Sequence, residues 1–173
     1  VSRTNNFRID PLISTGSAVL ADYKKSGYDR GHLAPAGDFV WSKKAMSETF
    51  YMSNMSPQIP GFNRGIWKKL ESLIRDWGTL YGDIHIITGP VLVDSLAHIG
   101  LNEVSIPKLY YKVILDFNGN DKKAIGFILE NKKSSIPLHK HVYTVNYIEK
   151  VTGIDFFEKL DDVEEEALES NFH

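Results

Sequence analysis

The chain has 173 residues, of which 42% are hydrophobic and 24% are charged, and it contains no cysteine. This length corresponds to one domain at roughly 150 residues per domain, and the composition is ordinary for a globular protein. The absence of thiols excludes a disulfide framework, a thiolate zinc site and a cysteine nucleophile. No apolar run approaches the roughly 18 residues that a membrane-spanning helix needs, so we expect no membrane partner.

The net charge of −2 conceals two oppositely charged regions. Residues 1–75 carry 11 Lys or Arg and 6 Asp or Glu, whereas residues 155–169 carry eight acids and one base. A basic half is compatible with an anionic polymer as partner, although ordinary surface charge is the simpler explanation of these numbers alone. We expect a main domain over residues 1–158 and an acidic helical tail over residues 159–173.

The first half of the chain shows few regular patterns. Residues 1–38 are rich in Gly, Pro, Asp and Ser, and we expect them to be mostly irregular. Ser42 is expected to cap a short helix that runs to about Glu48. The segment 49–55 is predicted to form a strand, which Pro57 stops.

The clearest helix starts near Asn63, where apolar residues recur at helical spacing, and Gly78 is expected to end it. Three strands are predicted after it, over residues 84–87, 109–117 and 124–130. The first of them is expected to end before a Gly-Pro pair.

A hairpin loop over residues 118–121 is expected to join the last two strands. Thr144 is predicted to cap a helix through about Thr152 that Gly153 closes, and residues 161–169 are expected to form a solvated acidic helix. Helices and antiparallel strands are mixed without a regular βαβ alternation, which indicates the α+β fold class.

Residues 29–32 read Asp-Arg-Gly-His and place an acid, a cation and a base next to a glycine. The His32 imidazole is suited to take a proton from water near neutral pH. Arg30 is suited to hold a phosphate or carboxylate with two hydrogen bonds. The alternative is that Asp29 pairs with Arg30 or with a distant group and only shapes the loop. The residues alone leave the two explanations about equally balanced.

Asn63, Trp67 and Glu71 are spaced i, i+4, i+8 and share one face of the predicted helix. At ~1.5 Å rise per residue, Asn63 and Glu71 are about 12 Å apart along the axis, too far to bind one ion directly. The spacing is compatible with Asn63 touching a metal and Glu71 reaching its water shell. Mg²⁺ suits such a site, because it keeps several waters. The simpler alternative is that Asn63 caps the helix and Glu71 pairs with Arg75.

Together these motifs resemble those of the DNA/RNA non-specific endonucleases, the ββα-metal or His-Me finger group that includes endonuclease G. The Asp-Arg-Gly-His motif is intact, and the second motif of the family matches in residue type and spacing at Asn54, Pro57, Gln58, Asn63, Trp67, Leu70 and Glu71. The resemblance runs from about Arg3 to Phe157. It implies a central antiparallel β-sheet flanked by helices, with the active site on a finger of two strands and a helix from about Asp29 to Trp77.

The resemblance implies a metal-dependent phosphodiesterase. His32 would be the general base for a water that attacks phosphorus, Asn63 the direct protein ligand of a hydrated Mg²⁺, and Glu71 the residue that holds metal-bound waters. Such a metal stabilises the developing charge and provides a proton to the leaving 3′ oxygen through a bound water. Mn²⁺ or another divalent ion is expected to substitute for Mg²⁺.

Four further residues have expected roles around this centre. Asn54 would support the site by hydrogen bonding, and Arg30 would hold or neutralise the phosphate. Arg3 and Lys68 are predicted to bind substrate. Because these contacts grip the backbone and not base edges, the predicted substrates are double- and single-stranded DNA and RNA, cut to 5′-phosphate and 3′-hydroxyl ends.

Two other functions stay open: a catalytically inactive nucleic-acid-binding domain of the same fold, and a metal phosphodiesterase for small substrates. The presence of both a base and a metal ligand argues against the first. The chain begins with Val1, so we expect that a preceding segment was removed, for which a signal or transit peptide is one candidate. We rank a secreted or periplasmic bacterial nuclease first and a mitochondrial one second. A homodimer is expected, and an inhibitor protein is left open.

Overall fold

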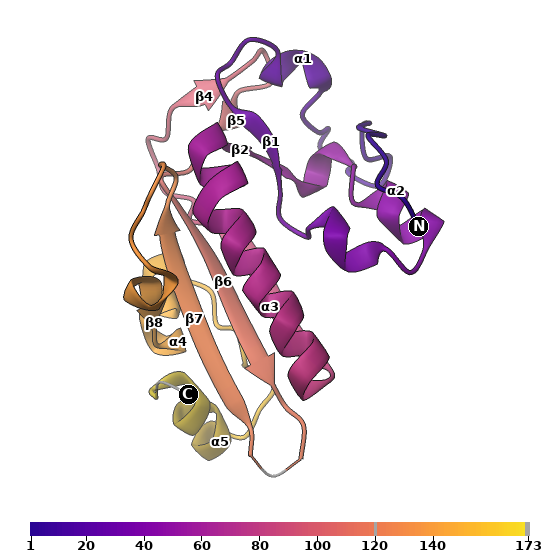
Figure 1. The fold of residues 1–173 in the computed structure, drawn as a ribbon. Coiled ribbons are helices and arrows are strands. Elements are labelled where there is room, and N and C mark those ends of the chain that lie inside the picture. The colour runs from indigo at the N-terminus through magenta and orange to yellow at the C-terminus, as the bar shows by residue number, and fades with distance from the viewer. Residues whose placement is uncertain (120, 172–173) are drawn as a thin grey trace. The chain divides into compact units, whose positions relative to one another are not determined.

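The computed structural model describes residues 1–119 and 121–171, and it divides into two compact units (Figure 1). The first unit contains Val1–Lys68, Val93–Pro107 and Asn131–Ser134. The second contains Lys69–Leu92, Lys108–Glu130 and Ser135–His173. Within the described ranges, every helix is too short or too polar to cross a bilayer.

The first unit consists of short elements around a two-stranded antiparallel ladder. Strands β1 (Asp29–His32) and β2 (Met55–Gln58) pair so that His32 lies opposite Met55. The other elements of the unit are α1 (Leu20–Tyr23), α2 (Lys43–Glu48), the paired strands β4 (His98–Ile99) and β5 (Val104–Ser105), and 3₁₀ turns at Ala36–Phe39 and Met52–Asn54.

Two small hydrophobic clusters hold this unit together. One contains Tyr23, Met52, Met55 and Ile99, and the other contains Ala36, Met46 and Phe50. The partly buried ring of Phe7 packs against both clusters. The ladder that carries the Asp-Arg-Gly-His motif therefore rests on apolar side chains from several separate segments.

The predictions for this part of the chain were correct at Ser42 and wrong at the following strand. The Ser42 side chain accepts a hydrogen bond from Ala45 N and caps α2 as expected. The strand predicted over 49–55 is instead a turn and a 3₁₀ helix, and the strand begins only at Met55. Pro57 lies inside β2. Among the described residues β2 pairs with β1 alone, so the missing N–H of the proline can face the unpaired edge of the strand.

Residues 1–38 were also predicted to be mostly irregular, and β1 is the main exception. Its sequence includes a glycine and two charged residues, so it lacks the β-branched and aromatic residues that mark a strand. Pairing with β2 therefore stabilises the extended conformation, which the residues of β1 do not favour by themselves.

The helix predicted from Asn63 is two segments and not one. Phe62–Trp67 forms a π-helical turn in which Gly65 has φ −105° and ψ −111°, outside the helical region. The α-helix α3 then runs over Lys68–Tyr81, past the end predicted at Gly78. A glycine adopts such dihedrals easily. The apolar residues on both sides of Gly65 still recur at helical spacing in the sequence, so the sequence alone does not show the break. The 12 Å axial separation of Asn63 and Glu71 was derived for one regular helix and does not apply.

The second unit is a four-stranded antiparallel sheet with helices on both faces. The strand order is β3-β6-β7-β8. Its strands are β3 (Ile84–Pro90), β6 (Leu109–Asp116), β7 (Lys123–Glu130) and β8 (Val142–Tyr143), and its helices are α3, α4 (Val145–Thr152) and α5 (Asp162–Glu169).

Neighbouring residues of β7 show which helix covers which face. The Trp77 ring of α3 packs against Phe127 with 6.2 Å between ring centroids. A Cβ on the adjacent Gly126 would lie 2.2 Å from Ile148 Cδ1 of α4. Since successive strand residues point to opposite faces, α3 and α4 cover opposite sides of the sheet, as Figure 1 shows. The predicted α+β class and the antiparallel sheet flanked by helices are confirmed.

The strand predictions were correct for β6 and β7 and too short for β3, which continues through Gly89 to Pro90. This strand pairs only with β6, so the proline costs no second ladder. The hairpin loop predicted over 118–121 falls between β6 and β7, and its residue Asn120 lies outside the described part of the chain.

The C-terminal predictions were mostly correct. Thr144 caps α4, its side chain accepting from Tyr147 N, and Gly153 closes the helix at φ +72°. Helix α5 begins after its cap at Asp161, but Leu168 and Glu169 are buried. The acidic helix is therefore solvated on one side only, because its last turn packs into the hydrophobic core of this unit.

Candidate active site

His32 ends β1 with its ring enclosed by two aromatic side chains. The ring is 4.8 Å from Phe50 and 6.1 Å from Phe7 between centroids, and both contacts are edge-on. His32 is 8% exposed, and its Nε2 has no hydrogen-bond partner among the described residues. Burial, followed by the charges of Arg3 and Arg30, lowers the pKa of His32 to about 4. The ring is therefore neutral at pH 7, the form that accepts a proton.

Two arginines approach the same aromatic pair. Arg3 Cζ lies 5.2 Å from the Phe50 ring centroid and Arg30 Cζ lies 4.3 Å from that of Phe7. The two rings are 4.9 Å apart and perpendicular. Both guanidinium groups also lower the pKa of His32. Two positive charges thus converge on the candidate base, which is a suitable environment for a phosphate.

Asp29 connects Asn63 to the strand that carries His32. Its Oδ2 accepts from Asn63 Nδ2 at 2.9 Å, and its two oxygens accept from Arg64 Nε and Nη2 at 2.8 and 2.6 Å. Burial alone would raise the pKa of Asp29, but the hydrogen bonds from Arg64 and Asn63 outweigh it and lower the pKa. The carboxylate is therefore ionised at neutral pH, and the distant group that pairs with Asp29 is Arg64.

This contact also fixes the orientation of the Asn63 amide. An ionised carboxylate only accepts hydrogen bonds, so the amide nitrogen must face Asp29 and the amide oxygen must point elsewhere. The side chain does not cap this turn, since Asn63 lies inside Phe62–Trp67 and the N-cap residue is Gly61. An oriented neutral oxygen fits a sparse Mg²⁺ site, in which water supplies most of the ligands.

Asn54 braces the loop that follows His32. Its Oδ1 accepts from Ala34 N at 2.9 Å, and its Nδ2 donates to Ala34 O at 2.9 Å and to Thr49 O at 2.8 Å. The backbone adds a bond from Leu33 N to Asn54 O at 3.0 Å. All these contacts are made to the main chain, so the Asn54 side chain holds the loop after His32 in place.

Gly31 is required by the packing of Gln58. A Cβ at position 31 would lie 2.1 Å from Gln58 Cδ and Oε1, and the Gln58 side chain is fully buried. The glycine between Arg30 and His32 therefore lets the second motif pack directly against the first.

We expect Gly31→Ala to lower the free energy of unfolding by about 1–3 kcal/mol, the usual cost of overpacking a core. Urea denaturation measures this change. Gly78→Ala, near the C-terminal end of α3 where the nearest atom to a new Cβ is at 3.6 Å, is the matched control and should stabilise the chain by up to about 1 kcal/mol. Equal stabilities for the wild type and Gly31→Ala would contradict the packing argument.

The lowered pKa of His32 predicts the pH dependence of activity. The neutral base is lost only as the pH falls through about 4, so kcat/KM should rise with pH through about 4 and then level off. A base with the ordinary histidine pKa of 6.5 would give a rise centred near that pH instead. Initial rates between pH 3.5 and about 8 in constant ionic strength distinguish the two. A midpoint of this rise near pH 6.5 would contradict the claim that burial and the two arginines lower the pKa of His32.

The first unit thus brings together most of the predicted site residues: His32, Arg30, Arg3, Asn54 and Asn63. Lys68 is exposed at the end of this unit, at the first position of α3. Glu71 belongs to the second unit. Sequence reasoning missed the ion pair of Asp29 with Arg64 and the ring of Phe50, since neither pairing has a local pattern.

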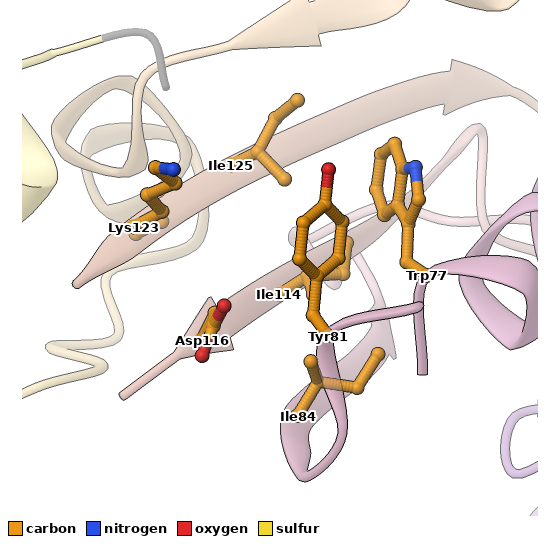
Figure 2. Close-up of a pocket in the computed structure, with 8 residues that line it drawn as sticks. Trp77, Tyr81, Ile84, Ile114, Asp116, Lys123 and Ile125 are labelled. Atoms are coloured by element: carbon orange, nitrogen blue, oxygen red, sulfur yellow. The ribbon is translucent and has the colours of Figure 1, made fainter. Parts of the chain in front are cut away.

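The hollow drawn in Figure 2 lies elsewhere and contains none of the predicted site residues. It has a volume of about 260 Å³ and lies between α3 and the sheet of the second unit. Trp77 and Tyr81 project from the helix over Ile114 and Ile125 of the strands (Figure 2). Asp116 and Lys123 are the charged residues in an otherwise largely apolar lining, so this hollow offers no set of groups for hydrolysis.

Comparison with known sequences decides the family. The family model described as DNA/RNA non-specific endonuclease matches residues 1–163. The chain is also 40% identical over 171 residues to nuclease C1 of Cunninghamella echinulata var. echinulata, covering 91% of this chain and 68% of that protein. The chain belongs to the DNA/RNA non-specific endonuclease family. The resemblance inferred from the two motifs is confirmed.

Two further relatives agree with this assignment. Human mitochondrial endonuclease G is 36% identical over 168 residues, covering 89% of this chain and 57% of that protein. A chain in the crystal structure of the EndoG/EndoGI complex superposes with a TM-score of 0.84 at 31% identity, covering 90% of this chain and 69% of that chain. Against several other curated relatives the chain spans about half of their length.

Proposed function

We propose that this member of the endonuclease family hydrolyses phosphodiester bonds in DNA and RNA with the help of Mg²⁺, leaving 5′-phosphate and 3′-hydroxyl ends. The observation that carries the proposal is His32, neutral at pH 7 and flanked by Arg3 and Arg30. The same strand is connected through Asp29 to the oriented amide of Asn63. A base, cations for a phosphate and an oxygen donor for a metal are the parts that phosphodiester hydrolysis requires.

In this proposal His32 accepts the proton of the water that attacks phosphorus. Its Nε2 is enclosed by protein, so we assign the proton transfer to Nδ1. Arg30 and Arg3 hold the phosphate and offset the negative charge that develops on its oxygens. Lys68, at the exposed start of α3, adds a further contact to the nucleic-acid backbone.

Asn63 would hold the metal through its amide oxygen, and Glu71 would hold metal-bound waters. When bound, Mg²⁺ or a substitute such as Mn²⁺ supplies charge stabilisation at the leaving oxygen. Asp29 keeps the Asn63 amide oriented, and Asn54 keeps the loop after His32 in place. Because the protein provides a single neutral oxygen, its affinity for Mg²⁺ alone should be low.

The substrate range follows from the kind of contact. Arginine and lysine side chains bind phosphates, which carry no sequence information. We therefore propose double- and single-stranded DNA and RNA as substrates. The alternatives are a catalytically inactive nucleic-acid-binding domain and a phosphodiesterase for small substrates.

Digestion of a supercoiled plasmid and of an RNA of similar length, with Mg²⁺ or with EDTA, separates these possibilities. The proposal predicts nicking and then fragmentation of both polymers with Mg²⁺ and none with EDTA. Binding without cleavage would indicate the inactive domain. Cleavage of a small phosphodiester with both polymers left intact would indicate the small-substrate enzyme.

Location, partners and domain limits are also proposals. Human endonuclease G is named as mitochondrial, which favours the mitochondrial location that the sequence analysis ranked second. None of the compared proteins supports the secreted or periplasmic location that was ranked first. The complex of EndoG with EndoGI makes an inhibitor protein a reasonable partner, and we keep the homodimer as an expectation. We assign the nuclease activity to residues 1–158 and treat residues 159–173 as an acidic tail.

A further inference from the structure

Three carboxylates from separate segments of the second unit converge on one point. Glu149 lies on α4, Asp155 follows that helix, and Glu169 lies in the last turn of α5. One carboxylate oxygen of each lies within 4.8 Å of the others. None of the residues proposed for catalysis belongs to this carboxylate cluster.

Two oxygens of the acidic helix are buried without a hydrogen-bond donor. Glu169 is 5% exposed, and its Oε1 has no partner among the described residues. The same is true of Oε1 of Glu165, one turn earlier on α5. Leaving a buried carboxylate oxygen unpaired is costly. The position of Glu149 is fixed differently, because its Oε1 accepts the backbone N–H of Phe156 at 2.8 Å.

The negative charge of the cluster has no counter-charge from the protein. Within the described residues, no Lys, Arg or His forms an ion pair with Glu149, Asp155, Glu165 or Glu169. Burial, followed by the charge of Glu149 and a side-chain hydrogen bond with Glu149, raises the pKa of Glu169 to about 8. Burial also raises the pKa of Glu165, with the charges of Asp155 and Glu149 adding to the effect. A cation at this point would remove the repulsion and satisfy the unpaired oxygens.

We infer that Glu149, Asp155 and Glu169 bind a Ca²⁺ ion that fastens the acidic helix α5 to α4. The donors are all oxygen atoms, with no imidazole or thiolate, and such a set selects a hard cation. Glu165, whose buried oxygen is also unpaired, lies close enough to add charge to the same site.

An irregular set of carboxylates from three segments suits Ca²⁺ better than Mg²⁺. Two ligands of one Ca²⁺, each at about 2.3–2.6 Å, can be up to about 5 Å apart, whereas two ligands of Mg²⁺ can be only about 4.2 Å apart. The three oxygens lie within 4.8 Å of one another, which is inside this limit for Ca²⁺. Ca²⁺ also tolerates irregular geometry and two-oxygen contacts from one carboxylate, as three side chains from three segments would provide.

The site gives the acidic tail a role that catalysis does not explain. Helix α5 contributes Leu168 to the hydrophobic core of the unit, and the next residue places its carboxylate in the cluster. Ca²⁺ would thus stabilise the docked position of the helix. The effect should appear as a calcium-dependent stability of the whole chain, independent of nucleic acid.

The test uses the full chain carrying Asn63→Ala, so that the proposed catalytic metal contact is absent. Its melting temperature is measured after EDTA treatment and then with increasing Ca²⁺ or Mg²⁺, and calorimetric titration with Ca²⁺ alone gives the affinity. We expect Ca²⁺ at about 100 times its Kd to raise the melting temperature by about 5 °C or more. Mg²⁺ should give a smaller rise at the same concentration.

Glu169→Gln in the same background should weaken Ca²⁺ binding by at least about 10-fold and reduce the thermal shift at the same Ca²⁺ concentration to about half or less. Glu166→Gln is the matched control, because Glu166 is exposed on the same helix and outside the cluster, and it should retain the full shift. If Glu169→Gln does not fold, Asp155→Asn tests the same prediction.

Three results would overturn the inference: no calcium-dependent shift, an equal shift in the cluster variants, or a shift with Mg²⁺ as large as that with Ca²⁺. If Ca²⁺ leaves the melting temperature unchanged but the chain becomes more stable as the pH falls, then a proton shared between the carboxylates, and not a metal, compensates their negative charge. Because no nucleic acid is present, each of these results leaves the proposed nuclease activity unaffected.

Discussion

Replacing His32 with alanine is expected to slow plasmid cleavage by at least about 10²–10⁴-fold, the usual loss when a general base is removed. The physical reason is that burial and the nearby charges of Arg3 and Arg30 keep the enclosed imidazole neutral at pH 7, because they lower its pKa to about 4. Without it, no described group of the site can accept a proton from the attacking water in the same place. Initial rates of nicking with saturating Mg²⁺ measure the effect.

The control for this variant is His85→Ala, since His85 is exposed on β3 and lies outside both motifs. It should cleave at the wild-type rate. Melting curves and DNA binding should show that His32→Ala is folded and still binds substrate. A rate above one tenth of wild type for His32→Ala would contradict the assignment.

Replacing Asn63 with alanine is expected to nearly eliminate cleavage at every practical Mg²⁺ concentration. The variant removes the proposed direct protein contact to the metal, and excess metal cannot restore a missing ligand. Glu71→Gln should behave differently, because it keeps the shape but loses the charge that orients metal-bound waters. We expect a reduced rate, a higher Mg²⁺ requirement, and partial rescue by Mn²⁺ or more Mg²⁺.

Mg²⁺ titrations of both variants, with Asn171→Ala as an exposed-asparagine control, decide between catalytic and structural roles. If Asn63 and Glu71 only stabilise the fold, each variant should lose about 1 kcal/mol or less and keep its specific activity. Two slightly less stable but fully active proteins would therefore contradict the metal site.

The sequence predicts best where one local pattern specifies an element. Strands β6 and β7 are long apolar segments around a hairpin, and α4 has Thr144 and Gly153 at its ends, so all three were predicted close to their observed bounds. The Asp-Arg-Gly-His motif was also recognisable, because its residues are adjacent in the chain.

Features that depend on distant residues were not predictable in this way. The pairing of Asp29 with Arg64, 35 positions away, has no local signature, yet it orients the Asn63 amide. The break at Gly65 leaves the apolar spacing unchanged, so one long helix was predicted where a π-turn precedes α3. Glu169 was expected to be solvated, and only the packing of α5 shows that it is buried.

The central claim, that His32 and Asn63 act together on one phosphodiester bond, is tested most directly by a double-mutant cycle of cleavage rates. The rates of wild type, His32→Ala, Asn63→Ala and the double variant are measured on the same plasmid at saturating Mg²⁺. Residues that act as a unit show strongly non-additive losses, so the account predicts that the double variant is no more than about 10-fold slower than the slower single variant. If the two losses instead multiply in full, the two residues act independently and the proposed site is wrong.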